Sequence, residues 1–521
     1  MPSMPSPPQT GCRPQDHPRL ARRGLLQVGG LGLLGTCLAD LLRLEAEAST
    51  RPARAARAKS VIWIFQSGGP SQFETWDPKP DAPSDIRGEY RPIPTTVAGL
   101  QVCEYLPKLA ARARDYSIIR TLYHPADRAF RNEHNASAYL LQTGTLGLPP
   151  GETTNSIPNP RPGRIEWPSI GSLLAYSLPN RSGTGLPPFI HLPRGGGDGP
   201  GRRPGILGNR YGAWSVDVAP PCHAPDPAGS CPNCFSHDQP DMLERQPGKG
   251  PKAWWDNSSC RDPSFKLPDF SLPAGLTLAR LENRRALLSQ LERIQRHLEH
   301  EPPARDLDQY RRQAMELVLA QRGKDNPFDL NRESDRVRDL YGRQEWGQGF
   351  LLARRLIESG ARMVQVNLRG WDTHQNAFRD LKSKLLPNLD HCLSGLLDDL
   401  KDRGLLDETL VVMCGEMGRT PVISPITPGG LNAAGVPFTP GRHHWGDVFP
   451  CFVAGAGIRP GQVLGQTDPT GGYPDGDGWT PADLAATLFH LLGVGPDEEF
   501  QDGEGRPYRI YQGTPIRPLL A

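Results

Sequence analysis

The chain has 521 residues, a mass of 57.2 kDa and a formal net charge of +2. This length allows one large domain with insertions or two domains, and the near-neutral charge, without a run of Lys and Arg, argues against a nucleic-acid partner. Its 57 Gly and 56 Pro account for much of a low hydrophobic content of 37% and indicate long irregular connections around a compact core.

Residues 1–48 are predicted to be an export leader outside the fold. Arg22 and Arg23 precede a weakly apolar stretch, Leu25–Leu42, a pattern that resembles a twin-arginine signal. Ala46-Glu47-Ala48 offers a cleavage site, and the alternative is an amphipathic helix or an uncleaved anchor. No later segment has the roughly 18 apolar residues of a membrane span. We therefore expect a mature chain without a span, in the periplasm or at the cell surface.

Short apolar runs bounded by turn residues predict strands, and these alternate with segments of helical periodicity. The predicted strands are Ser60–Phe65, Tyr116–Thr121, Pro188–Leu192, Met363–Leu368, Leu410–Met413 and Val448–Ala454. The predicted helices are Tyr105–Ala113, Arg131–Gln142, Ile170–Leu178, Leu276–Leu298, Gln309–Ala320, Gln348–Ser359, Phe378–Leu400 and Ala482–Leu492. This alternation predicts an α/β fold, with a mostly parallel central sheet and helices on both faces. One domain is expected over residues 58–521.

A long irregular insertion, rich in Gly, Pro, Asp and Asn, is predicted at residues 193–273. It contains four cysteines and a histidine close together in the chain: Cys222, Cys231, Cys234, Cys260 and His237. A Cys-x-x-Cys with a further Cys and His suits a structural zinc site. Export favours disulfides instead, and the sequence leaves both alternatives open.

Several long stretches resemble one known superfamily. LKDRGLLDETLVVMCGEMG (residues 400–418) resembles the stretch of sulfatases and alkaline phosphatases whose strand ends in a metal-binding Asp-His-Gly turn. HNASAYLLQTG (134–144) resembles the sulfatase signature helix, and residues 449–465 and 480–494 resemble the end of that fold. SGGPSQFETWDPKPDAP, GWDTHQN, GEMGRTP and the His-Trp of GRHHW are similar to an exported bacterial sulfatase-like family, the domain of unknown function numbered fifteen hundred and one. The resemblance covers about residues 20–520.

The resemblance implies one or two metal ions, held by Asp and His side chains at several strand ends. The expected ligands are Asp372 and His374 after the strand at 363–368, Glu416 in place of the superfamily Asp, and His443 or His444, of which His444 matches the family's His-Trp. Ligands of open α/β sheets lie at the carboxyl ends of strands, which agrees with the positions of Asp372, His374 and Glu416, while His443 and His444 lie in a loop just before the strand at Val448. In the alternative reading Asp372 caps the next helix, His374 is merely exposed, and Glu416 pairs with Arg419.

The first strand ends differently from the superfamily pattern. Gln66-Ser67 stands where one or two Asp are expected, so a carboxylate from this loop has to come from Glu74 or Asp77, or is missing. The alternative for both acids is ion pairing with Lys79 and Arg87. Exposed charges of this kind are usually solvated.

His134 falls at the position of the sulfatase nucleophile, where this chain has no Cys for formylglycine. It could bind metal, act as a general acid or base, or become transiently phosphorylated. Ser137 is the nearest hydroxyl, Ser71 is a second candidate, and Arg419 completes the expected catalytic set. A metal-activated water is the more economical mechanism because it needs no protein nucleophile.

These observations predict an exported, metal-dependent hydrolase of phosphate or sulfate esters that acts on a small-molecule or glycan ester. The expected cofactor is a divalent ion: zinc, calcium or manganese. The alternative is a catalytically inactive exported binding protein for anionic glycans, which the missing nucleophile and the missing Asp-His pair favour. An oxidoreductase is disfavoured, because Gly68-Gly69 lacks the G-x-G-x-x-G spacing of a dinucleotide turn.

Overall fold

The structure is a computed structural model that describes residues 56–125, 128–147, 166–178, 186–192, 199–216, 326–424, 439–502 and 504–521, with a few positions between 280 and 287. The predicted leader, the predicted helix at 309–320 and most of the one at 276–298 lie outside the described residues. So do the cysteines and histidine of the predicted insertion, Cys222, Cys231, Cys234, Cys260 and His237. Zinc or disulfides at that place stay a prediction.

Within the described residues, the central sheet has eight strands in the order β12-β4-β11-β8-β1-β7-β5-β6. Their bounds are β1 Ser60–Gln66, β4 Tyr116–Leu122, β5 Phe189–Leu192, β6 Trp214–Ser215, β7 Met363–Leu368, β8 Thr409–Cys414, β11 Phe449–Gly455 and β12 Val463–Leu464. All neighbours pair in parallel except β11, which is antiparallel to both β4 and β8. The predicted, mostly parallel sheet is thus confirmed. The ends of β1, β4, β7 and β8 and the start of β11 share one edge.

Each predicted strand is present to within one residue at either end. Every residue of β1, β7 and β8 is buried, as expected of central strands in a mostly parallel sheet; β7 includes two buried polar residues, Gln365 and Asn367. The sequence did not predict β6 and β12, since each has only two residues and no periodicity. β6 lies at the start of the predicted insertion and joins the sheet edge beside β5.

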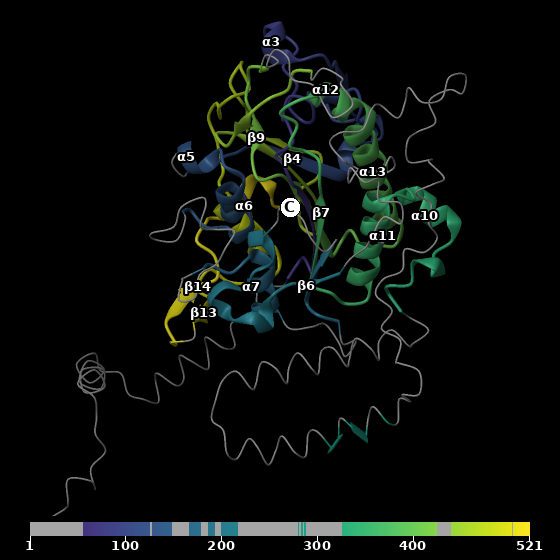
Figure 1. Cartoon of the computed structure of the whole chain (residues 1–521), viewed down its shortest axis with the longest axis vertical. Coiled ribbons are helices and arrows are strands. Elements are labelled where there is room, and N and C mark those ends of the chain that lie inside the picture. The colour runs from purple at the N-terminus through teal and green to yellow at the C-terminus, as the bar shows by residue number, and fades with distance from the viewer. Residues whose placement is uncertain are drawn as a thin grey trace, which may run out of the picture. The chain divides into compact units, whose positions relative to one another are not determined.

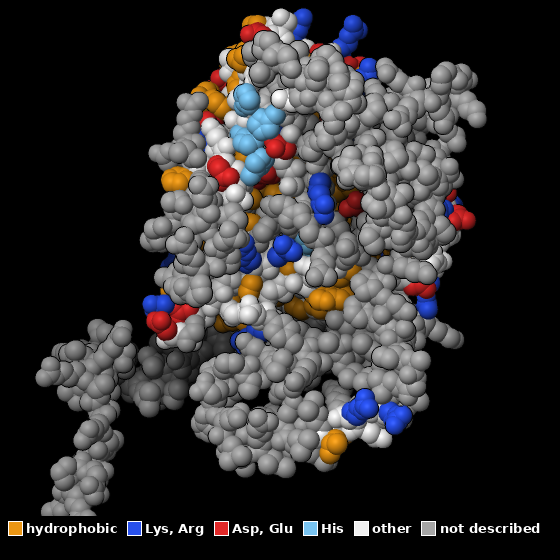
Figure 2. Space-filling view, viewed as in Figure 1, with side chains coloured by type: hydrophobic (Ala, Val, Ile, Leu, Met, Phe, Trp, Pro, Cys, Tyr) orange, Lys and Arg blue, Asp and Glu red, His pale blue; other side chains and the backbone are white. Residues whose placement is uncertain are grey.

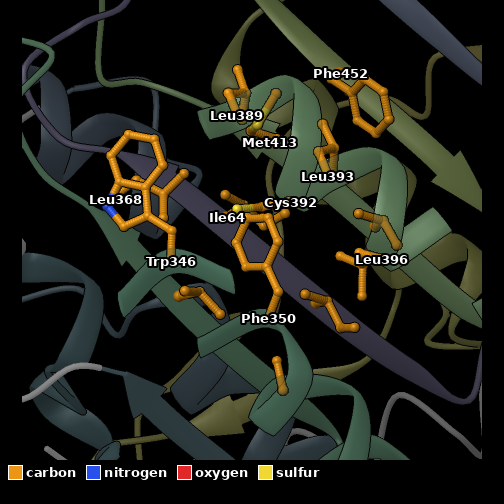
Figure 3. Packing of buried hydrophobic residues seen from close by; sticks show 14 of the residues in the cluster. Ile64, Trp346, Phe350, Leu368, Leu389, Cys392, Leu393, Leu396, Met413 and Phe452 are labelled. Atoms are coloured by element: carbon orange, nitrogen blue, oxygen red, sulfur yellow. The ribbon is translucent and has the colours of Figure 1, made fainter. Parts of the chain in front are cut away.

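Helices cover both faces of the sheet, as predicted (Figure 1). On one face lie α4 (Pro107–Ala111), α10 (Asp335–Tyr341), α11 (Glu345–Glu358) and α13 (Leu386–Asp402), and on the other α6 (His134–Thr143), α7 (Ile170–Ser177) and α14 (Pro481–Leu491). Alternate residues of β1 contact the two layers: Ile62 and Ile64 the first, Trp63 and Phe65 the second. Figure 3 shows Ile64 packed among side chains of α11 and α13.

Two predicted helices are each divided into more than one element in the structure. The one predicted from Arg131 is observed as two helices, α5 (Arg128–Arg131) and α6. They are separate because Glu133 has an extended backbone and is the N-cap of α6, where its side chain accepts the N–H of Ala136 at 3.0 Å. The one predicted at 378–400 is observed as α12 (Ala377–Asp380), a π-turn at Leu381–Leu385 and α13. Pro387, at the start of α13, has no N–H to continue regular α-helical bonding.

The remaining elements are short. Three two-stranded sheets pair β2 (Pro92–Pro94) with β3 (Gln101–Cys103), β9 (Gly418–Arg419) with β10 (His444–Trp445), and β13 (Glu499–Gln501) with β14 (Pro507–Arg509). Helix α3 is Ser84–Arg87, and 3-10 turns lie at Ala113–Asp115, Gly199–Arg202, Gly205–Leu207, Asn209–Tyr211, Leu330–Arg332 and Arg517–Leu519. Among the described helices, none has the length and apolar character needed to cross a bilayer.

Buried His191 of β5 provides a pH-dependent prediction. Burial, reinforced by the charges of Arg202 and Arg369, lowers the pKa of His191 to about 3, whereas an unfolded histidine titrates at about 6.5. Below pH 6.5 the unfolded chain binds a proton that the folded chain does not, so stability falls as the pH falls. Between pH 7.5 and 5, the wild type should lose about 2 kcal/mol more free energy of unfolding than His191→Gln, measured by urea titration. Equal losses would contradict this linkage.

Candidate metal centre

Four side chains from three separate parts of the chain meet at the edge of the sheet where the parallel strands end. His134 is the first residue of α6, Asp372 and His374 lie in the loop after β7, and His444 lies in β10, just before β11. One nitrogen or oxygen atom from each lies within 4.8 Å of the others. Their side chains are between 19% and 37% exposed. Figure 2 shows histidine side chains gathered at the surface beside acidic ones, so the group is open to solvent.

The carboxylate of Asp372 lies at the centre of this group. Its Oδ1 is 3.0 Å from Nε2 of His374 and 3.2 Å from Nε2 of His444, and its Oδ2 is 3.3 Å from Nε2 of His134. The Nε2 atoms of His374 and His444 are 2.8 Å apart. All three imidazoles therefore present the same ring atom to one carboxylate. Three imidazoles and a carboxylate are a donor set that suits a divalent transition metal or zinc.

Electrostatics around the group favour positive charge at its centre. Burial opposes the charge of Asp372, but hydrogen bonds from the three histidines and the charge of Arg419 hold its pKa well below the usual range. Burial also opposes protonation of His134, yet hydrogen bonds to Asp372 and Glu416 raise its pKa to about 10. A cation between these carboxylates is thus stabilised, which is what a metal site requires.

Each imidazole also has a partner at its other ring nitrogen, Nδ1. Glu416 lies 2.7 Å from Nδ1 of His134, and the backbone oxygen of Asn132 lies 2.9 Å from Nδ1 of His444. Nδ1 of His374 lies 3.0 Å from Nδ1 of His443. Such outer contacts set the tautomer and orientation of ligand histidines. The structure thus places His444 in the group, and His443 and Glu416 behind it.

Arg419 lies behind Asp372 with a fully buried side chain. Its Nη2 donates to Oδ1 of Asp372 at 2.7 Å, so its partner is Asp372 and not Glu416. Its guanidinium also donates to four backbone oxygens: those of Gly68, Gly69, Trp371 and Arg442. The side chain therefore joins the loops after β1 and β7 to the segment before β11.

The loops after β1 and β7 touch through their backbones. Gly68 has φ +116°, and a Cβ atom there would lie 2.2 Å from the backbone nitrogen of Asp372. Only glycine fits this approach. On the far side, fully buried Trp371 stacks on Trp346 of α11, with ring centroids 5.9 Å apart. Asp372 is thus held between the β1 loop and the helical layer, and it does not cap α12, whose N-cap is Asn376.

The predicted carboxylates of the β1 loop lie apart from the group. Glu74 is buried and pairs with Arg442 at 2.7 Å, and it accepts the hydroxyl of Ser71. Asp77 is also buried, with Lys79 and Arg120 each at 3.3 Å. Pairing of Asp77 with Lys79 matches the ion-pair alternative, whereas Glu74 pairs with Arg442 and not with Arg87. Neither carboxylate faces the three histidines.

Neither predicted hydroxyl contacts the histidine group. Ser137 is fully buried and donates to the backbone oxygen of Arg131 at 2.8 Å. Ser71 is 2% exposed and donates to Glu74. The N-terminal turn of α6 is capped by Glu133, so its N–H groups do not all point to an open site. Of the predicted catalytic residues, only His134 lines the group directly.

Sequence reasoning did not single out Arg442, Asn132 or Gly68 as parts of the site. Arg442 directly precedes the two histidines of GRHHW and pairs with buried Glu74. Its place in that motif was the one signal in the sequence that pointed to it. Asn132 acts through its backbone oxygen on His444, and a backbone contact leaves no signal in residue type. The contact of Gly68 with Glu416 is of the same kind.

The profile of a family described as "Protein of unknown function (DUF1501)" matches residues 58–520. No curated protein matches the chain. Solved structures that it resembles include Ps i-CgsB in complex with k-i-k-neocarrahexaose (12% identity, 88% of this chain and 76% of that one, TM-score 0.35). They also include the phosphonate monoester hydrolase SpPMH from Silicibacter pomeroyi (15% identity, 89% of this chain and 76% of that one, TM-score 0.31). A third is alkaline phosphatase from the Antarctic bacterium TAB5 (10% identity, 84% of this chain and 99% of that one, TM-score 0.31). At such identities and TM-scores, the chemistry of this chain has to come from its own side chains.

The contacts of Arg419 predict that its loss destabilises the protein. Arg419→Ala removes one partner of a charge pair and strands four backbone oxygens in a buried place. We expect the free energy of unfolding, measured in urea, to fall by at least ~3 kcal/mol. Arg506→Ala, which removes an exposed ion pair with Asp502, is the control and should change stability little. A similar small effect of both substitutions would contradict the structural role of Arg419.

Proposed function

The chain belongs to the DUF1501 family of proteins of unknown function, and we propose that it is a metal-dependent hydrolase of phosphate or sulfate esters. The observation that carries the proposal is the convergence of His134, Asp372, His374 and His444, with donor atoms within 4.8 Å of one another. The group stands at the edge of the sheet where parallel strands end, which is the usual ligand position of open α/β sheets.

Zinc is the ion that these residues suit best among the three expected from the sequence. Imidazole nitrogen is a preferred donor for zinc, and four-coordinate zinc accepts three imidazoles with one carboxylate. Calcium takes six to eight oxygen ligands, which three imidazoles do not supply. Manganese prefers oxygen-rich sites and is second. One ion per chain is proposed, because Glu74 and Asp77 are paired with cationic side chains elsewhere.

An ion held by His134, Asp372, His374 and His444 would supply Lewis acidity towards the ester oxygens and would make bound water more nucleophilic. The protein residues supply position and charge. Arg419 holds Asp372 from behind at 2.7 Å, and Glu416 holds His134. The partial exposure of the four side chains lets an anionic ester reach them. Because the hydroxyls of Ser71 and Ser137 are bonded elsewhere, water is the proposed nucleophile.

The proposals for export and for the class of substrate rest on the sequence and its family resemblance. We propose that residues 1–48 are a twin-arginine leader and that the mature protein acts in the periplasm or at the cell surface on a small-molecule or glycan ester. A folded metal centre is compatible with that route, which carries proteins already folded. N-terminal sequencing of the exported protein should find a start directly after Ala48.

The buried hydroxyls also favour a second candidate function. A protein without a free hydroxyl nucleophile at its metal centre could bind anionic glycans without cleaving them. Ser71 and Ser137 both donate to other groups, and this is the specific observation behind that candidate. Metal content and turnover together separate the two functions, because only the hydrolase needs the metal to convert its ester.

Metal content is the first test of the proposed centre. Purified wild-type protein incubated with zinc and then desalted should hold one ion per chain by elemental analysis. His374→Ala and His444→Ala should each lower the content well below one, because each removes a ligand. His490→Ala, a histidine of α14 outside the group, is the matched control and should keep the full content. Wild-type protein without stoichiometric metal would contradict the centre.

Hydrolysis is the second test. Aryl phosphates and aryl sulfates would be screened with added zinc, manganese or calcium. We expect turnover that chelation abolishes, and a fall in kcat/KM of roughly 100-fold or more in His374→Ala, because Lewis-acid stabilisation amounts to several kcal/mol. His490→Ala should retain wild-type kinetics. Metal binding without turnover of either ester class would favour the glycan-binding candidate.

A further inference from the structure

Among the described residues, Glu416 contacts the members of the metal centre through one histidine, His134. Its Oε1 lies 2.7 Å from Nδ1 of His134, the ring nitrogen that points away from Asp372. Its two oxygens also accept the backbone N–H of Gly68, at 2.8 and 3.1 Å. The residue is 2% exposed and does not belong to the group whose donor atoms converge. Its carboxylate therefore lies behind His134, not beside Asp372.

This contact determines which nitrogen of His134 faces the other ligands. An ionised carboxylate only accepts hydrogen bonds, so Nδ1 of His134 carries the proton. Nε2 of the same ring faces Oδ2 of Asp372 at 3.3 Å, and it is the nitrogen whose proton a metal ion would replace while Nδ1 keeps its own. Glu416 thereby selects the tautomer in which His134 can bind a metal.

Glu416 is itself held by contacts on two sides. Gly68 donates to its carboxylate, and the backbone of Gly68 lies against that of Asp372. Nε2 of buried His124 lies 2.6 Å from the backbone oxygen of Glu416. The position of His134 is thus coupled, through Glu416 and Gly68, to the loop that carries Asp372.

The three ligand histidines differ in the partner at Nδ1. His444 has a backbone carbonyl, and His374 has the exposed imidazole of His443. Of these three Nδ1 atoms, only that of His134 lies next to a carboxylate, and that carboxylate, from Glu416, is buried. Hydrogen bonds to ionised acceptors are about twice as strong as neutral ones, and burial reduces their screening.

We propose that Glu416 is the positioning residue of this metal centre: it fixes His134 from outside the ligand set and does not bind the ion. The inference rests on the proposed metal-dependent function and refines it. It departs from the ligand role that the sequence predicts for Glu416. The chain has a glutamate where the superfamily motif has its aspartate, and this glutamate reaches a histidine instead of the ion.

Zinc affinity, measured by calorimetric titration of the full chain, tests the role without any substrate. Glu416→Ala should weaken zinc binding 10- to 100-fold, the usual cost of losing an outer carboxylate. Glu416→Gln keeps an acceptor oxygen without charge and should lie between Ala and wild type. Glu333→Gln is the matched control: Glu333 is a carboxylate with a side chain 10% exposed, paired with Arg354 and Arg355, and its loss should leave zinc affinity unchanged.

Two spectroscopic measurements separate positioning from ligation. In the zinc-loaded protein with 15N-labelled histidine, NMR should show a proton on Nδ1 of His134, and that signal should shift or vanish in Glu416→Gln. X-ray absorption at the zinc edge should give the same ligand set in wild type and Glu416→Gln. An oxygen ligand lost in Glu416→Gln would overturn the inference, and so would an unprotonated Nδ1 in wild type.

The outcomes also separate this inference from the proposed function. Wild-type protein that binds no zinc overturns both. Wild type that binds zinc, with Glu416→Ala binding equally well, overturns only the positioning role. If Glu416→Ala does not fold, Glu416→Gln and the wild-type NMR spectrum still decide the question.

Discussion

The candidate site depends on one buried cation. Arg419 is fully buried, and a guanidinium in that place has to satisfy its N–H donors with protein acceptors. It does so with Asp372 and with backbone oxygens from the loop after β1, the loop after β7 and the segment before β11. These segments are far apart in sequence, and the same contacts bring His374 and His444 together. The arrangement of the proposed metal ligands thus depends on the hydrogen bonds that the buried Arg419 guanidinium makes to these three segments.

The reversed direction of β11 completes the site. Parallel strands bring only their carboxyl ends to the ligand-binding edge, and β1, β7 and β8 do so here. Because β11 is antiparallel to β4 and β8, its amino end lies at that edge. The residues just before it, including His444, therefore face the loop that carries Asp372. A fully parallel sheet would place that histidine at the opposite edge.

Much of the fold was predictable because strands buried on both faces consist largely of apolar residues. β7 has the predicted bounds, since Met363–Leu368 is buried throughout and ends at Arg369-Gly370. The antiparallel β11 was not predicted, because an apolar run has no direction. The start of α6 was displaced by Glu133, whose capping contact depends on a local turn. In the site, the strand-end positions of Asp372 and His374 were visible in the sequence, and His444 was singled out by the His-Trp motif.

The sequence by itself determined the alternating strands and helices and named the four side chains that converge: His134, Asp372, His374 and His444. Only the tertiary structure decided how the charged groups around them pair. Glu416 faces Gly68 and His134, Arg419 faces Asp372, and Glu74 faces Arg442, more than 300 positions away in the chain. Strands could be predicted because most buried strand positions are occupied by apolar residues, which are visible in the sequence. Partner choice among buried charges depends on distances of a few ångströms between distant segments, and no local pattern records those.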